Sequence, residues 1–501
     1  MRRGGIPRPR VAVIGAGLAG VLVAVKLKQA GYDQFTVFER EAGPGGVWWK
    51  NTYPGCEVDV PSEAYSYSFI GYDWSRTHAR QPELREYVRH VIERYGIGEH
   101  LRFGVAVKSA DWNPDSATYT IEAESGSMGE FDVAVSCLGT LSHPNMPRWP
   151  GLESFERPVF HTSAYQHEHD LTGKRVAVVG TGSTACQLVP ALAPVVGQLD
   201  LYQREPGYIL PKHERDLEPA ERTARARSRV RRRVRRALMI WQAQKLAVAL
   251  DIKHQRNQVV RDFCRHIIAK TVRDPRTRAA VTPDYAYGCK RPVIASTFYP
   301  TLNEPNVALI PHAVDDLTPG GVRDVTGVER PADVVVLATG FQATNYLATL
   351  DVHGPDGRSL HEVWGEEPAA FLGVTVPGFP NFFILYGPNT NGGWSVITQL
   401  EIQARLVLRT IGKVRPGRTV IDTRRSAADR YDRWVQRGIA DKLSSLADGC
   451  HNYYTATTGK NVTQWPHGHL TYLMATLLLS PTGLVRRSAA IGTPAVERGH
   501  R

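Results

Sequence analysis

The chain has 501 residues and a formal net charge of +12, with hydrophobic residues at 42% and charged residues at 22% of the sequence. This composition is typical of a globular protein, and the length exceeds what one hydrophobic core usually fills, so we expect two or three domains. The sequence contains no apolar run long enough to cross a bilayer and no signal segment, so we expect a cytoplasmic protein with no membrane span.

The first motif is a glycine-rich loop between a predicted strand and a predicted helix. An apolar strand at 11–14 leads into Gly15-x-Gly17-x-x-Gly20. The first glycine permits a tight turn, the second lets a pyrophosphate approach the backbone, and the third lets the helix pack closely against the strand. A second predicted strand ends at Glu39, where a carboxylate accepts hydrogen bonds from ribose hydroxyls. The unit predicts a Rossmann-like dinucleotide site.

A second copy of this unit carries the opposite charge at the matching position. The loop is Gly180-x-Gly182-x-x-Ala185, and Arg204 follows Gly180 at the same sequence distance as Glu39 follows Gly15. An arginine at this position accommodates a 2′-phosphate. The first loop is therefore expected to bind FAD and the second NADPH. The helix that follows the second loop contributes two further expected cofactor contacts, Ser183 and Gln187.

Two further buried-strand patterns, at 132–140 and 333–341, lie on either side of the second loop. The second one ends in a turn with Thr339 and Gly340, which we expect near a cofactor. We predict an α/β fold with two Rossmann-like domains, in which the NADPH domain is inserted into the FAD domain. We expect the first part of the FAD domain at 1–150, a linker at 151–172 and the NADPH domain at 173–330. The second part of the FAD domain, with the substrate cavity, is expected at 331–480, and a flexible tail at 481–501.

An arginine-rich stretch at 222–236 accounts for much of the positive charge. On a helix these arginines would surround most of the circumference, and Val230 and Val234 would form a thin apolar line. We interpret this region as a solvated helix that covers another domain. Binding of RNA or of an anionic membrane surface is the alternative. Because no aromatic residues are interleaved with the arginines, we expect no nucleic-acid partner.

The segment after the first unit contains a G-G-x-W pattern and a Y-P-G-x-x-x-D pattern, with Gly46, Trp48, Tyr53 and Asp59 at the key positions. Here the sequence resembles the Baeyer–Villiger monooxygenases, which lie within the wider class of flavin-containing monooxygenases. The resemblance extends from residue 10 to about 475. It implies that these residues line the flavin ring and that Asp59 is the active-site aspartate.

The resemblance continues at Lys290-Arg291-Pro292. It implies that Lys290 contacts the 2′-phosphate of NADPH and that Arg291 stabilises the peroxide anion formed on reduced flavin. A permanently charged guanidinium suits that anion and the alkoxide that develops from a ketone. Asp59 would orient Arg291 and balance its charge. The expected reaction is insertion of one oxygen atom from O2 beside a ketone carbonyl.

The family fingerprint between the two loops is matched only in part. Phe155 and His161 agree with it, whereas Arg157 replaces a glycine and Tyr165 replaces a tryptophan. The resemblance implies that this linker, with His161, couples movement of the NADPH domain to the flavin. The two departures leave N- or S-oxygenation of an amine or thioether as the alternative reaction. Three aromatic residues are candidates for walls of the substrate cavity, or else for plain core: Trp394, Trp465 and Tyr472.

The chain has six cysteines, and none of them forms a C-x-x-C pair. This spacing argues against a zinc site and against a disulfide reductase, and it is typical of cysteines that stay reduced in the cytoplasm. We therefore expect no metal and no disulfide.

Overall fold

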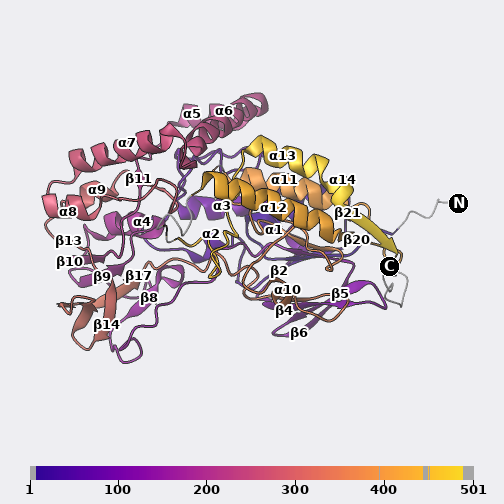
Figure 1. The fold of residues 1–501 in the computed structure, drawn as a ribbon, viewed down its shortest axis with the longest axis horizontal. Coiled ribbons are helices and arrows are strands. Elements are labelled where there is room, and N and C mark those ends of the chain that lie inside the picture. Colours follow the sequence, from indigo (N-terminus) through magenta and orange to yellow (C-terminus); the bar gives the residue numbers. More distant parts are fainter. Residues whose placement is uncertain (1–6, 394, 444–449, 451, 489–501) are drawn as a thin grey trace, which may run out of the picture.

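The computed structural model describes residues 7–393, 395–443, 450 and 452–488 (Figure 1). Two five-stranded sheets organise the fold, and each one carries one of the glycine loops at the end of a strand. The first sheet has the order β19-β7-β1-β2-β3, all parallel. Its strands are β1 (Val11–Ile14), β2 (Phe35–Glu39), β3 (Leu101–Phe103), β7 (Val133–Ser136) and β19 (Phe382–Ile384).

The second sheet has the order β13-β10-β9-β17-β8 and is also parallel. Its strands are β8 (Val159–His161), β9 (Arg175–Val179), β10 (Gln198–Tyr202), β13 (Val307–Ile310) and β17 (Val334–Leu337). The first sheet takes strands from both sides of this block in the sequence, so the NADPH domain is inserted into the FAD domain as predicted.

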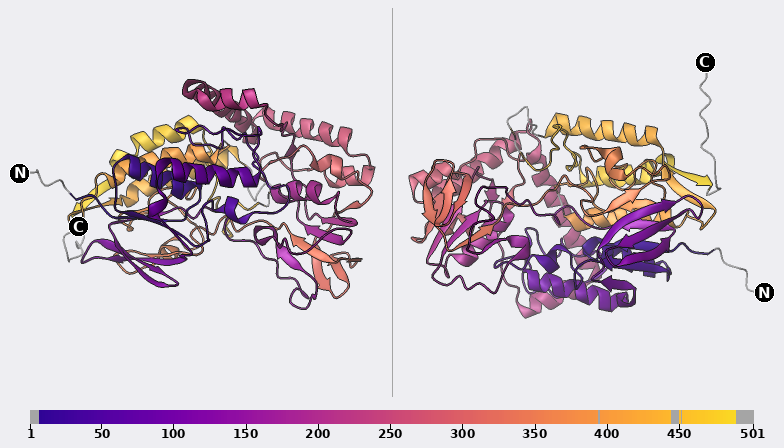
Figure 2. Two further views of the ribbon diagram at one scale, coloured as in Figure 1. Left: turned by 180° about the vertical axis from the view of Figure 1, so that it is seen from behind. Right: turned by 90° about the horizontal axis from the view of Figure 1, so that it is seen from below.

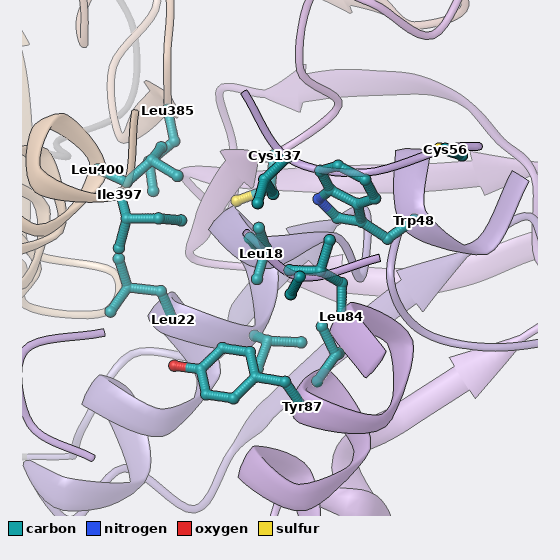
Figure 3. Packing of buried hydrophobic residues seen from close by; sticks show 14 of the residues in the cluster. Leu18, Leu22, Trp48, Cys56, Leu84, Tyr87, Cys137, Leu385, Ile397 and Leu400 are labelled. Atoms are coloured by element: carbon teal, nitrogen blue, oxygen red, sulfur yellow. The ribbon is translucent and has the colours of Figure 1, made fainter. Parts of the chain in front are cut away.

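Helices cover the first sheet, so its central strands β1 and β7 are buried on both faces, which is the usual state of a parallel sheet. The helices α1 (Leu18–Gln29), α3 (Gln81–Tyr95) and α11 (Val396–Ile411) pack together on one face. Figure 3 shows their apolar side chains meeting in the core, with Leu22 of α1 beside Tyr87 of α3 and with Ile397 and Leu400 of α11. This core holds the first glycine loop in place.

Smaller sheets and peripheral helices complete the two domains. A mixed sheet has the order β18-β4-β5-β6, in which β18 pairs parallel with β4 and the other pairs are antiparallel, and an antiparallel sheet has the order β14-β15-β16. Their strands are β4 (Val107–Asn113), β5 (Thr118–Ala123), β6 (Gly126–Phe131), β18 (Asp351–His353), β14 (Val314–Thr318), β15 (Gly321–Asp324) and β16 (Glu329–Pro331). Peripheral helices are α4 (Ser183–Leu192), α5 (Pro219–Arg227), α6 (Arg229–Ala247), α7 (Gln255–Thr271), α12 (Arg425–Lys442) and α13 (His469–Leu478).

The predicted boundary at residue 331 is wrong. The strand β17, which we assigned to the returning FAD domain, pairs with β9 and β8 in the NADPH sheet. The linker range 151–172 contributes β8 to the same sheet. The chain rejoins the first sheet only at β19. A run of buried β-branched residues indicates a parallel strand, but it does not specify which sheet the strand joins.

The predicted flexible tail at 481–501 is also partly wrong. Residues 480–483 form the short helix α14 (Ser480–Gly483), and β21 (Leu484–Ser488) pairs antiparallel with β20 (Thr419–Thr423). Residues 489–501 lie outside the described residues. In the part of the chain that the structure describes, no helix is both long and apolar enough to cross a membrane.

Candidate active site

The first glycine loop is a close contact between backbone segments. A side chain at Gly20 would place its Cβ 1.8 Å from the carbonyl oxygen of Gly15, so only glycine fits there. Glu39 is buried and accepts a hydrogen bond of 2.7 Å from the backbone N–H of Ala16. Gly17 is the N-cap of helix α1, and no side chain of the described residues caps it. Its N-terminal N–H groups therefore suit a pyrophosphate, with Glu39 beside the loop for the ribose.

The second loop repeats this arrangement at the N-terminus of α4. Gly182 precedes the helix, no described side chain caps it, and a Cβ at this position would have no atom within 4 Å. Arg204 follows β10 with its side chain exposed. Lys290 forms an ion pair with Glu205, the next residue after Arg204. Arg204 and Lys290, 86 positions apart in the printed sequence, thus reach the same end of the NADPH sheet. The open loop and its two cations fit a phosphorylated dinucleotide.

Gln187 of α4 links the two domains. Its side-chain amide donates to Asp59 Oδ1 at 3.1 Å and to the Glu57 carbonyl at 3.0 Å, while its Oε1 accepts from the Tyr53 hydroxyl at 2.9 Å. A Cβ at Gly55, where φ is +81°, would lie 2.4 Å from the Gln187 carbonyl oxygen. This close approach explains the glycine in the Y-P-G segment. Gln187 therefore holds the segment at 53–59 against the NADPH domain.

Asp59 and Arg291 form an ion pair beside this contact, with 3.7 Å between Arg291 Nη2 and Asp59 Oδ2. The Asp59 side chain is 15% exposed and that of Arg291 is 44% exposed. Burial alone would lower the pKa of Arg291, but Tyr453 and Asp59 outweigh that effect and the pKa lies above its ordinary value. The guanidinium is therefore a fixed positive charge that one carboxylate orients and that still has an open side.

Trp48 lies on the short helix α2 (Val47–Lys50), whose N-cap residue is Gly46. Its indole N–H donates to the Tyr65 hydroxyl at 3.1 Å, and the two rings pack edge to face. Burial raises the pKa of Tyr65 to about 12, so its hydroxyl stays neutral. Gly46 and Gly17 approach closely, because a Cβ at Gly46 would lie 3.0 Å from the Gly17 Cα. The two glycine segments that flank the expected flavin site are thus in contact.

The chain resembles known flavoprotein monooxygenases over nearly its whole length. The pattern of the flavin-binding monooxygenase-like family matches residues 8–261. A Baeyer–Villiger monooxygenase of Streptomyces coelicolor is 38% identical over 464 residues, which cover 91% of this chain and 88% of the relative. The chain belongs to the flavin-binding monooxygenase-like family.

Solved structures of similar enzymes agree with this family. Cyclohexanone monooxygenase from Rhodococcus sp. Phi1, solved with NADP+, superposes with a TM-score of 0.86 at 26% identity, covering 96% of this chain and 99% of that one. OTEMO in complex with FAD and NADP also gives a TM-score of 0.86 at 26% identity, covering 96% of this chain and all of the other. The predicted fold class, the FAD and NADP cofactors and the class of enzyme, a flavoprotein monooxygenase, are thereby confirmed.

In this family member, His161 joins the linker to the turn that follows β17. The backbone N–H of Ser163 donates to Nδ1 of His161, so Nε2 carries the proton and donates to the Gly340 carbonyl at 3.1 Å. Burial lowers the pKa of His161, which keeps the ring neutral. Thr339 donates to the Asn145 carbonyl at 2.7 Å. In this structure Thr339 and Gly340 therefore anchor the linker. Their predicted contact with a cofactor remains a prediction.

The two departures from the fingerprint have separate structural surroundings. Arg157 donates to the Ala332 carbonyl and lies 3.5 Å from an Asp333 carboxylate oxygen, so it joins the linker to the residues before β17. Tyr165 packs edge to face on Phe160. Both side chains support the linker from the NADPH side.

Tyrosines around Arg291 were not predicted from the sequence. Tyr386, Tyr453 and Tyr454 all lie close enough to raise the pKa of its guanidinium. All three fall within the range 10–475 of the family resemblance, but no motif singles them out as site residues. Of the predicted cavity walls, Trp465 and Tyr472 pack edge to face within the main core, and Trp394 lies outside the described residues. Within the described residues, no cluster of His, Cys, Asp and Glu could hold a metal ion.

The expectation that all cysteines are reduced is wrong for this structure. Cys289 and Cys450 form a disulfide across a sequence separation of 161 residues, and the other four cysteines are free and buried. A search for C-x-x-C pairs detects only neighbours in sequence, so it missed this bond. The disulfide joins Cys289, the residue before Lys290 and Arg291, to the segment that carries Tyr453.

The disulfide predicts a defined thiol count. Alkylation of the unfolded protein without reductant is expected to modify four cysteines, and alkylation after reduction is expected to modify all six. Intact-protein mass spectrometry measures both numbers. Six modified cysteines without reductant would show that Cys289 and Cys450 are not bonded.

Proposed function

We propose that this enzyme oxidises a ketone to an ester or lactone, and that Arg291 and Asp59 are the residues that carry the oxygen transfer. The observation that supports this most strongly is the Asp59–Arg291 ion pair, which lies where the segment at 53–59 meets the NADPH domain. In the overall reaction the ketone and O2 consume NADPH and a proton, and the products are the ester, water and NADP+. When bound, reduced FAD supplies the activation of O2.

The chain's own part in the reaction is electrostatic. A ketone carbonyl oxygen gains negative charge as its carbon is attacked, and a fixed guanidinium beside it stabilises that charge. Arg291 suits this role because it is permanently charged and part of its side chain is open. Asp59 positions the guanidinium from one side, and Gln187 positions Asp59. A heteroatom oxygenation, in which no alkoxide develops, would need these charges less.

The second loop supports a choice of NADPH over NADH. Arg204 is exposed at the end of β10, where it can meet a 2′-phosphate. The neighbouring carboxylate of Glu205 would repel a phosphate, but Lys290 pairs with it and removes that repulsion. We infer that Arg204 binds the phosphate directly and that Lys290 supports it by neutralising Glu205. The use of NADPH, a reductant that cells maintain in the cytoplasm, favours a cytoplasmic site of action.

Replacement of Arg204 tests the nucleotide choice. Arg204→Ala is expected to raise KM for NADPH about ten- to a hundredfold, because a charge-assisted phosphate contact is lost, and to leave KM for NADH nearly unchanged. Steady-state oxidation of each nucleotide measures the effect. Arg276→Ala, an exposed arginine of the same domain, is the control. Equal losses for both nucleotides would show that Arg204 does not recognise the 2′-phosphate.

Replacement of Arg291 tests the proposed reaction. Arg291→Ala is expected to retain FAD and to be reduced by NADPH, yet to form ester about a hundred- to a thousandfold more slowly, because a preorganised charge is lost. Asp59→Ala is expected to act in the same direction. Stopped-flow flavin absorbance and product analysis with a ketone and a thioether measure the two stages separately. Arg323→Ala removes an arginine of similar exposure from an ion pair outside the site and serves as control. Full ester formation by Arg291→Ala would refute the assignment.

A further inference from the structure

The helix α6 is amphipathic, and the face that packs against the rest of the protein is the charged one. Arg235 donates to Glu63 at 2.9 Å and Arg236 donates to Glu401 at 3.1 Å, and Arg236 is buried. Arg232 donates to the Ala226 carbonyl. A surface helix of a globular protein normally turns its apolar stripe inward and its charges outward. Arg235 and Arg236, which we expected to be solvated, therefore attach α6 to the FAD domain, whereas Arg229, Arg231 and Arg233 are exposed as expected.

The outward face of α6 is an apolar stripe. Val230, Val234, Leu238 and Trp241 follow one another at spacings of four, four and three residues, which places them on one side of a helix. Their exposed fractions are 71%, 54%, 52% and 55%. The predicted thin line of Val230 and Val234 is thus the beginning of a longer stripe, and this stripe faces away from the protein.

Positive charges border this stripe. Arg229, Arg231 and Arg233 are exposed and form no ion pair with any residue in the described ranges. Nearer the C-terminal end, the ammonium group of Lys245 lies 3.4 Å from the centre of the Trp241 ring. An apolar helix face with Lys and Arg along its margins is the arrangement of helices that lie in the interface of an anionic bilayer.

Neighbouring helices extend the apolar surface. α7 exposes Val259 and Phe263, one helical turn apart, and α13 exposes Leu470, Met474 and Leu478. In Figure 1, α6, α7 and α13 lie along the upper edge of the molecule, and the view from behind in Figure 2 shows them along the same edge. Exposed apolar side chains gathered along one edge of a protein favour an interaction site there.

We propose that the edge formed by α6, α7 and α13 docks on the surface of an anionic lipid bilayer. A second copy of this chain is a poorer occupant, because a symmetric contact through α6 would bring each copy's basic margin close to the other's. A nucleic acid is also a poorer occupant, because Arg232, Arg235 and Arg236 turn inward and the exposed stripe consists of apolar side chains. This inference is independent of the reaction that the enzyme catalyses.

Vesicle flotation with the FAD-loaded enzyme tests the proposal. We expect the enzyme to float with vesicles of phosphatidylcholine mixed with phosphatidylglycerol, and to bind vesicles of phosphatidylcholine alone at least about tenfold less. Leu238→Ser with Trp241→Ser is expected to lower binding to the mixed vesicles roughly tenfold or more, because less apolar protein surface is then removed from water on binding. Arg231→Gln with Arg233→Gln is expected to lower it about thirtyfold, and added salt is expected to weaken the wild type.

The matched control is Val325→Ser with Val328→Ser, which removes two exposed valines in and beside the turn between β15 and β16. This variant is expected to float like the wild type. Flavin content verifies folding, and the comparison of the two vesicle types needs no variant. Absence of flotation with the mixed vesicles would overturn the proposal. So would self-association, measured by analytical ultracentrifugation and lost in Leu238→Ser with Trp241→Ser. Salt-sensitive RNA binding would overturn it as well, if Leu238→Ser with Trp241→Ser retains that binding and Arg231→Gln with Arg233→Gln loses it.

Discussion

The side-chain amide of Gln187 is the contact on which the arrangement of the site depends. It belongs to the NADPH domain, yet its hydrogen bonds go to Tyr53, Glu57 and Asp59 of the FAD domain. Asp59 in turn orients Arg291, which the chain reaches only after most of the inserted domain. Burial raises the pKa of Tyr53 well above its ordinary value, so its hydroxyl remains a donor to Gln187. One neutral amide thus connects the domain that binds the reductant to the charges proposed for oxygen transfer.

Much of this could be predicted from the sequence, because the constraints are local. The glycines of each loop fall within six consecutive positions. The charge of the residue at the end of the next strand indicates whether the nucleotide has free ribose hydroxyls or a 2′-phosphate. Glu39 does lie at its loop, and Arg204 does lie at the end of β10. The pairing of Asp59 with Arg291 was not visible in either segment alone. It followed from the family resemblance, and the distance between the two side chains supports it.

The predictions that failed depend on contacts between distant segments. The pattern of β17 shows that it is buried, but its partners β8 and β9 are set by how the domains pack. Arg235 and Arg236 of α6 are not solvated because they pair with Glu63 and Glu401, which lie far away in the sequence. Cys289 and Cys450 meet for the same reason. Periodicity and spacing describe one element at a time, and these features belong to pairs of elements.

The measurement that tests the coupling of the domains most directly is the yield of ester per NADPH oxidised by Gln187→Leu, which removes the amide and keeps a similar volume. A hydrogen bond to a charged group contributes about 1.5–3 kcal/mol. The account therefore predicts that FAD retention and KM for NADPH change little, while ester formation falls about ten- to a hundredfold and hydrogen peroxide takes the place of the ester. An unchanged yield of ester with a strongly raised KM for NADPH would contradict it, because Gln187 would then act only as a nucleotide contact.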